Sequence, residues 1–149
     1  MARIGSFRVL ARRLKFVREV LGQNRGAWVG FIQRFTGNEA GDSWCASFVS
    51  LVLDIAYDGK PPLRRTASAD AMYRECRNKG FIMNNPLPDC LFFYLNADGI
   101  AHHVGIVTAT APLAGIAGNT SPDGLSANGD GVYEHILNAT SIAFAALPA

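Results

Sequence analysis

The spacing of apolar residues changes once along the chain, and this change limits the possible folds more than any other feature of the sequence. Up to about residue 80, apolar residues recur at intervals of three and four, which is the period of an amphipathic helix. After Pro86 and Pro88 the apolar runs are short, rich in β-formers, and separated by turn-forming clusters. Helices followed by strands predict an α+β domain, with N-terminal helices packed on a C-terminal antiparallel sheet.

The first predicted helix is amphipathic and basic. It covers about residues 6–21, and Arg8, Arg12 and Lys15 lie on its polar face. Residues 1–25 contain seven cations and one carboxylate, a net charge of +6, whereas the whole chain carries +2. This asymmetry indicates contact with an anionic envelope through the basic face, and a solvated face without a partner is the alternative.

Three more helices are predicted before the strands begin. A short one lies within about residues 28–35. The next starts at a cap, Asp42 or Ser43, and its apolar residues cover nearly the whole circumference, which indicates a buried helix. The last begins at Thr66 or Ser68.

Short apolar runs predict the strands of the second part. They cover residues 90–95, 103–107, 132–137 and 142–144. Residues 96–99 form a turn-type connection between the first two strands. A chain of 149 residues is expected to form a single domain over 1–149.

The sequence predicts neither a membrane-spanning helix nor a signal peptide. Residues 99–122 carry no formal charge, but His102, His103 and several glycines and prolines would be unfavourable in a lipid-spanning helix. Arg8 and Arg12 interrupt the apolar residues at the N-terminus, so no signal-peptide core is present there. We therefore expect synthesis in the cytoplasm.

Cys45 stands at the predicted start of the buried helix. Unpaired backbone amides and the helix dipole favour a thiolate at such a position, so Cys45 is a candidate nucleophile. A small buried hydrophobe is the alternative, because most free cysteines are buried. Cys76 and Cys90 are expected in the core, and an odd number of cysteines predicts neither a disulfide framework nor a paired-cysteine metal site.

A cysteine nucleophile needs a histidine base and a third polar group that orients the base. The candidate bases are His102, His103 and His135. On a strand, His102 and His103 point to opposite faces, and His103 shares its face with Gly105, which leaves room for a close neighbour. This favours His103, with Asn119 as the orienting group; an ordinary strand histidine and a turn asparagine are the alternatives.

Four segments, in order along the chain, resemble the signatures of one family. They are Trp44-Cys45-Ala46-Ser47-Phe48-Val49, Asp89-Cys90-Leu91-Phe92-Phe93, His103-Val104-Gly105-Ile106-Val107, and Gly118-Asn119-Thr120 with Gly131-Val132-Tyr133. Over about residues 18–137 the chain is similar to CHAP domains, the cysteine, histidine-dependent amidohydrolases/peptidases of phage-type peptidoglycan hydrolases.

The resemblance implies a papain-like fold and hydrolysis of an amide bond in bacterial peptidoglycan, by an N-acetylmuramoyl-L-alanine amidase or an endopeptidase. It implies that Cys45 is the nucleophile, His103 the general base and acid, and Asn119 the orienting residue. No metal or organic cofactor is implied. Trp44 and Tyr133 are candidates for substrate contact, and core packing is the alternative for each.

The chain departs from the family pattern at two points. Ala117 stands where many members have a glutamate two residues before the asparagine, and Pro88 stands where they have glycine.

Two other functions stay open: a non-catalytic wall-binding or virion structural module, and an intracellular cysteine protease. A wall hydrolase without a signal peptide is expected to act after lysis, from a virion or through a secretion system. We expect a monomer that binds no nucleic acid.

Overall fold

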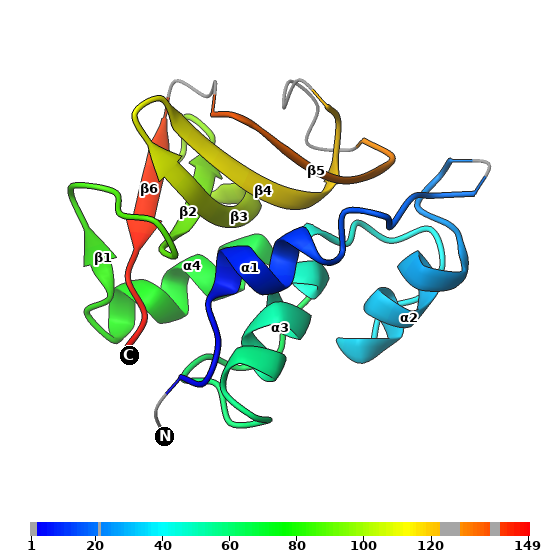
Figure 1. Ribbon diagram of the computed structural model, residues 1–149, viewed down its shortest axis with the longest axis horizontal. Helices are drawn as coiled ribbons and strands as arrows, with labels where there is room; N and C mark the ends of the chain where they lie inside the picture. The colour runs from blue at the N-terminus through cyan, green and yellow to red at the C-terminus, as the bar shows by residue number, and fades with distance from the viewer. Residues whose placement is uncertain (1–2, 21, 123–128, 138–140) are drawn as a thin grey trace.

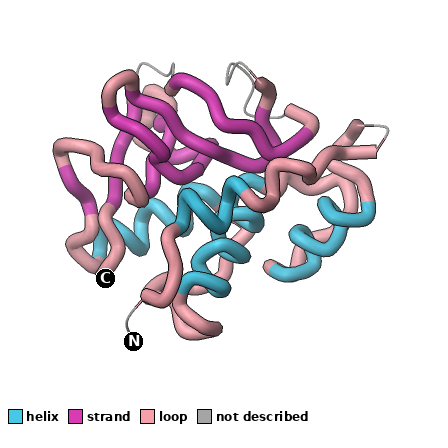
Figure 2. Tube along the Cα trace, viewed as in Figure 1, coloured by secondary structure: helices cyan, strands magenta, loops and turns pink. Residues whose placement is uncertain are grey.

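Strands from the second half of the chain form one antiparallel sheet, and helices cover one of its faces (Figures 1 and 2). The computed structural model describes residues 3–20, 22–122, 129–137 and 141–149. The helices are α1 (Phe7–Arg12), α2 (Ala27–Phe35), α3 (Cys45–Ala56) and α4 (Ala69–Asn78). The strands are β1 (Ile82–Met83), β2 (Leu91–Leu95), β3 (Ala101–Thr110), β4 (Leu113–Thr120), β5 (Gly131–Ile136) and β6 (Ile142–Ala145).

The sheet has the order β1-β6-β2-β3-β4-β5. In Figure 1, α1, α3 and α4 lie beneath the sheet, while α2 is set to one side of it. This arrangement confirms the α+β class. Within the described ranges, no helix is both long enough and apolar enough to span a bilayer.

Apolar side chains fill both sides of the sheet. On the inner side, α3 packs Phe48 and neighbouring residues against strand residues such as Val104. The opposite side, which we call the outer face, carries a second cluster that includes Phe92 and Phe144. The Phe92 ring lies over Gly105, where a Cβ atom would come within 2.5 Å of it. The glycine is therefore required for this ring to lie flat on β3.

The first predicted helix is wrong in length. It was expected over residues 6–21, but α1 ends at Arg12. Residues 13–16 form turns, and the backbone then reaches the sheet edge, where Arg18 forms an antiparallel bridge with Gly131 at the start of β5. Hydrogen bonding to an edge strand replaces the helical bonds that would have continued α1. Leu21, at the end of the predicted helix, lies outside the described residues.

The predicted cap of α4 is confirmed, and the predicted cap of α3 is wrong. Ser68 caps α4 as expected, since its side chain accepts the backbone N–H of Ala71 at 3.0 Å. For α3 the prediction of Asp42 or Ser43 is wrong, because Trp44 occupies the cap position and no side chain caps the helix. The backbone amides of the first turn of α3 therefore lack the usual side-chain acceptor.

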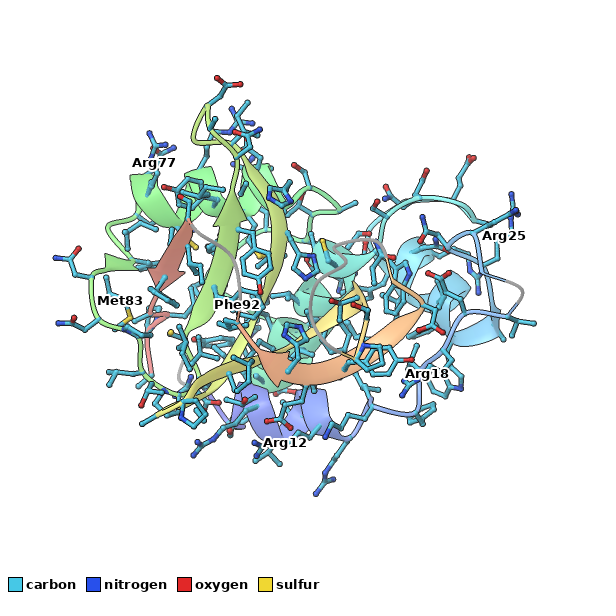
Figure 3. All side chains as sticks on the ribbon, turned by 90° about the horizontal axis from the view of Figure 1, so that it is seen from above. Arg12, Arg18, Arg25, Arg77, Met83 and Phe92 are labelled. Atoms are coloured by element: carbon cyan, nitrogen blue, oxygen red, sulfur yellow. The ribbon has the colours of Figure 1, made fainter. Side chains whose placement is uncertain are left out.

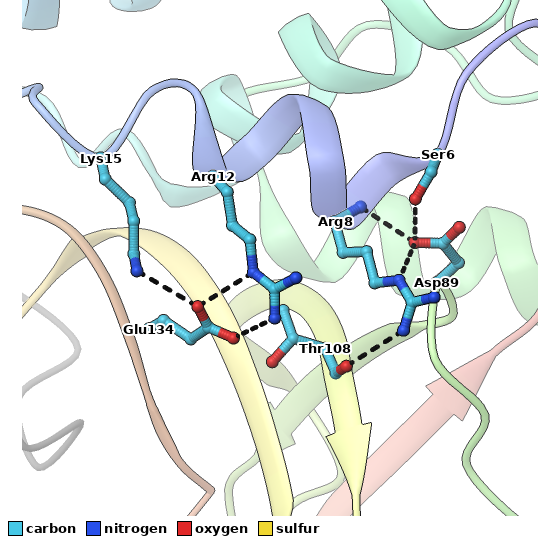
Figure 4. Close-up of polar contacts among 7 residues, drawn as sticks. All are labelled: Ser6, Arg8, Arg12, Lys15, Asp89, Thr108 and Glu134. Atoms are coloured by element: carbon cyan, nitrogen blue, oxygen red, sulfur yellow. Dashed lines mark hydrogen bonds and ion pairs between the residues drawn. The ribbon is translucent and has the colours of Figure 1, made fainter.

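Ion pairs and hydrogen bonds connect α1 and the turn that follows it to the sheet (Figure 4). Arg12 donates to both carboxylate oxygens of Glu134, at 3.1 and 2.7 Å, and Lys15 lies 3.2 Å from the same carboxylate. At the other end, Asp89 accepts the backbone N–H of Arg8 at 2.9 Å. The cations that were predicted to meet an anionic envelope thus have carboxylate partners within the chain, and external contact through them stays a prediction.

Replacing Glu134 with glutamine is expected to lower the free energy of unfolding by about 1–2 kcal/mol at neutral pH. The hydrogen bonds from Arg12 lower the pKa of the Glu134 carboxyl from 4.5 to about 2. A carboxyl with a lowered pKa stabilises the folded state above its unfolded pKa, and this contribution is lost as the pH falls from 4.5 toward 2. Urea unfolding at a series of pH values measures the difference.

The matched control is Glu39→Gln, which removes an exposed carboxylate from the loop before α3. This variant should keep the stability of the wild type. If Glu134→Gln is equally stable at neutral pH, the ion pairs contribute nothing to the docking of α1.

Candidate active site

The start of α3 lies where β3 and β4 stop pairing. Their pairing ends at Ile106 with Ile116, and Val104 and Gly118 lie beyond that pair. A Cβ atom at Gly118 would lie 2.7 Å from the Trp44 ring, so the residue before Cys45 packs directly on β4. The first turn of α3 is thereby held against the ends of these two strands.

The thiol of Cys45 is almost fully buried, with 5% of the residue exposed. Burial raises the pKa of this thiol, while hydrogen bonds from the backbone amides of Val104, Ala46 and Cys45 itself lower it. Burial is the larger effect, so the pKa is raised overall. The expectation of a thiolate is therefore wrong for this closed state, although the three amides would stabilise one once water or substrate entered.

His103 precedes Val104 and is fully buried. Its ring centroid lies 5.4 Å from that of Tyr94 and 6.2 Å from that of Phe92, which places the imidazole on the outer face. Burial, together with the nearby imidazoles of His135 and His102, lowers the pKa of His103 from 6.5 to about 3. The imidazole is therefore neutral, and neither nitrogen has a hydrogen-bond partner among the described residues.

His102 differs from its neighbour in exposure. Tyr94 pairs with His103, but Leu95 pairs with Ala101, so His102 is the extra residue of a β-bulge. It is exposed, whereas His103 is buried. The ring centroids of His102 and His103 lie 6.3 and 5.4 Å from that of Tyr94, so both imidazoles are beside the same ring. The prediction that they point to opposite faces is wrong because the bulge interrupts the alternation of the strand, and the choice of His103 as base stays a prediction.

Asn119 lies at the end of β4 in a left-handed backbone conformation, with φ of 55°. It is fully buried, and neither its side-chain oxygen nor its nitrogen has a hydrogen-bond partner in the described part of the chain. Both an irregular register between β4 and β5 and the positive φ occur at this strand end. Buried polar atoms without partners each cost about 1–3 kcal/mol, so such a group is unusual in a purely structural position.

The structure brings the three predicted residues to the same strand ends without joining them. Cys45 faces Val104 from the helix side, and the imidazole of His103 lies on the outer face. No hydrogen bond links Cys45, His103 or Asn119 to one another within the described residues. All three residues are buried.

The two predicted substrate contacts differ from each other. Trp44 is fully buried, and its indole N–H donates to Glu19 at 2.9 Å, so it packs in the core and contacts no substrate in this state. Tyr133 is half-buried, with the guanidinium of Arg18 4.0 Å from its ring centroid. Its hydroxyl donates to Asp130 at 2.7 Å, so only part of the ring is available for contact with a ligand.

Sequence reasoning missed one residue that positions the site. Gln33, on the buried side of α2, donates from its amide nitrogen to the backbone oxygens of Asn24 and Asp42, each at 2.8 Å. These bonds hold the loop that leads into Cys45. A glutamine inside an apolar helix face is the signal that could have identified it, since such a residue is rarely buried without partners.

The free energy of unfolding is expected to depend on pH because His103 is buried in the folded state. The folded state keeps the imidazole neutral down to pH about 3, whereas the unfolded state binds a proton near 6.5. Stability should therefore fall as the pH drops from 6.5 toward 3, by about 2 kcal/mol at pH 5. His103→Gln should flatten the slope of unfolding free energy against pH between 7 and 5, roughly the range above carboxyl titration.

His102→Gln is the matched control, because it removes an exposed imidazole from the adjacent position. This variant should keep the slope of the wild type. A slope that is the same in all three proteins would mean that His103 titrates normally in the folded state.

The described residues contain no group of three or more His, Cys, Asp or Glu side chains that could hold a metal ion. Cys76 and Cys90 are buried, as predicted. Comparison with known proteins adds nothing to this geometry: no protein-family model, no curated protein and no solved structure matches the chain.

Proposed function

We propose that the protein is a cysteine hydrolase of papain-like arrangement that cleaves an amide bond in bacterial peptidoglycan. The observation that carries the proposal is the environment of Cys45 at the uncapped start of α3. Its thiol accepts hydrogen bonds from three backbone amides, one of which belongs to Val104, the residue after His103. Asn119 follows Gly118, which packs on the ring of Trp44. His103 and Asn119 carry buried polar atoms without described partners. Perturbed and unsatisfied groups of this kind concentrate at functional sites.

The proposed reaction has two halves, acylation of the Cys45 sulfur and release of the acyl group by water. His103 takes the proton of the Cys45 thiol as sulfur bonds to the amide carbonyl carbon, and the first-turn amides of α3 stabilise the oxyanion. The carbon–nitrogen bond then breaks, and His103 returns the proton to the leaving amine. Water, deprotonated by His103, releases the acyl group and restores the thiol. Asn119 would orient the imidazole in the absence of a carboxylate at Ala117.

A neutral thiol and a neutral imidazole are a suitable resting pair for this sequence. Because burial raises the pKa of Cys45 and lowers that of His103, neither group is charged before substrate arrives. Opening of the site to water would move both pKa values toward their ordinary ranges and favour proton transfer from sulfur to nitrogen. Because His103 projects from the face of β3 opposite to Cys45, its imidazole reaches the sulfur only if the β3 backbone around His103 rearranges, and the proposal requires this change.

A non-catalytic wall-binding or virion structural module is the second candidate. The burial of Cys45, His103 and Asn119 favours it, because a permanently closed site cannot contact a polymer. Under this proposal the protein would bind peptidoglycan and leave every bond intact.

Incubation of the protein with purified sacculi separates the two candidates. A hydrolase releases soluble fragments and new amino groups, and mass spectrometry of the fragments distinguishes an amidase from an endopeptidase. A structural module sediments with the sacculi and releases nothing. Cleavage of a protein substrate together with inertness on sacculi would instead support an intracellular cysteine protease.

A further inference from the structure

Three aromatic side chains form an exposed cluster at the end of the molecule that carries α2. Phe16, Trp28 and Phe31 are 56%, 49% and 49% exposed. Their rings contact one another edge to face, with centroids 5.0 Å apart for Phe16 and Trp28 and 6.1 Å apart for Trp28 and Phe31. Large aromatic side chains on a monomer surface usually mark an interaction site.

Unpaired arginines accompany each aromatic side chain in the sequence. Arg13 precedes Phe16 by three residues, Arg25 precedes Trp28 by three, and Arg34 follows Phe31 by three. All three arginines are exposed, and none forms an ion pair with a described residue. Figure 3 shows Arg25 extending outward from this end of the molecule. We call the set Phe16, Trp28, Phe31, Arg13, Arg25 and Arg34 the aromatic–basic surface.

No ion pair with a described carboxylate neutralises the charge of this surface. The chain has no Asp or Glu between Glu19 and Glu39. Glu19 itself is turned inward, where it accepts hydrogen bonds from the indole of Trp44 and the backbone of Asn24. Arg25 and Arg34 therefore have no carboxylate in the chain segment that carries Trp28 and Phe31, while the Arg25 guanidinium lies near Gly41, in the loop that contains Glu39 and Asp42.

We infer that the aromatic–basic surface binds the interface of an anionic phospholipid bilayer. Tryptophan and phenylalanine partition into the headgroup region of a bilayer, and arginine pairs with lipid phosphates at the same depth. Figure 1 shows α2 to one side of the sheet, at the edge of the molecule. A neutral glycan would account for the rings but leave the three guanidinium groups without partners.

A second basic surface of the molecule lacks these properties and supplies the control. A groove of about 580 Å³ beside α4 is lined by Arg64, Arg65, Arg74 and Lys79 among other residues. Arg65 pairs with Asp54 at 3.2 Å, and Arg74 and Lys79 also pair with carboxylates. The groove is therefore largely neutralised.

Co-sedimentation with phosphatidylcholine vesicles, with and without phosphatidylglycerol, tests the inference. The wild type should bind only the vesicles that contain phosphatidylglycerol, with a blue shift of Trp28 fluorescence, and added salt should weaken binding. Trp28→Ala should lower the affinity at least about tenfold. Arg13→Gln, Arg25→Gln and Arg34→Gln together should lower it about a hundredfold.

The charge-matched control combines Arg64→Gln, Arg65→Gln and Arg74→Gln, and it should retain binding. In Trp28→Ala the remaining tryptophan, Trp44, is buried, so its fluorescence verifies that the variant is folded.

Three results would overturn the inference: equal binding to both vesicle types, no binding to either, or an equal loss of binding in the control variant. Binding to sacculi that depends on Trp28, with no binding to vesicles, would assign the surface to a wall polymer instead. Cys45→Ala should bind vesicles like the wild type, so this result is independent of the proposed hydrolysis.

Discussion

Replacing Cys45 with alanine is expected to abolish peptidoglycan hydrolysis, with a loss of at least about a thousandfold in the rate of fragment release. In the proposed mechanism the sulfur forms the bond to the acyl group, and no other described side chain takes its place. The substitution removes one buried sulfur atom and leaves the backbone amides around it unchanged. Release of amino groups from sacculi, measured at equal protein concentration, gives the rate.

Cys90→Ala is the matched control for this loss. Cys90 is 2% exposed and belongs to the outer cluster of the sheet, so its removal also takes a buried thiol from the core. A hydrolase that uses Cys45 keeps its activity in Cys90→Ala. If Cys45→Ala releases fragments at the wild-type rate, the proposed chemistry is wrong, and sedimentation with sacculi would then decide whether the chain is a binding module.

Helix positions could be predicted where the local pattern and the tertiary contacts agree. The residues of α3 are apolar around the circumference, and the helix is buried on nearly all sides as expected. The start of this helix was predicted less well, because the cap is Trp44 and neither Asp42 nor Ser43. For α1 the two disagreed: apolar spacing continues beyond Arg12, but the backbone there pairs with β5, which is more than a hundred residues away in sequence. The local sequence pattern cannot indicate that a segment pairs with a strand so far away in the chain.

The strand β4 shows a second limit. The segment Leu113–Thr120 is rich in glycine and alanine, and its only β-branched residues are Ile116 and Thr120, so it carries few of the residues that identify a strand. The structure explains its composition, because a Cβ atom at Gly115 would lie 2.6 Å from the Phe92 ring. Small residues occur where rings from other elements cross the strand. The burial of His103 could not be predicted for the same reason, because it depends on Phe92 and Tyr94 of β2.

Gly118→Ala is expected to destabilise the protein by about 3 kcal/mol and to lower Tm by roughly 10 °C. The added Cβ would lie 2.7 Å from the Trp44 ring and 2.9 Å from the Cβ of Phe48. Neither neighbour can move freely, because a hydrogen bond to Glu19 holds the indole and the Cβ of Phe48 is fixed to the α3 backbone. Space for the methyl group therefore requires α3 to move away from β4, which also displaces Cys45.

Gly30→Ala makes the same chemical change with the opposite expected sign. The nearest atom to a Cβ at Gly30 is the guanidinium of Arg34 at 3.1 Å, the end of a flexible and exposed side chain. Since Gly30 is within α2, alanine should stabilise the helix by about 0.5–1 kcal/mol. Thermal unfolding of the two variants tests whether α3 is held by close contact with β4. If Gly118→Ala unfolds at the wild-type temperature, that contact is loose, and the site at the start of α3 is less rigidly placed than the structure indicates.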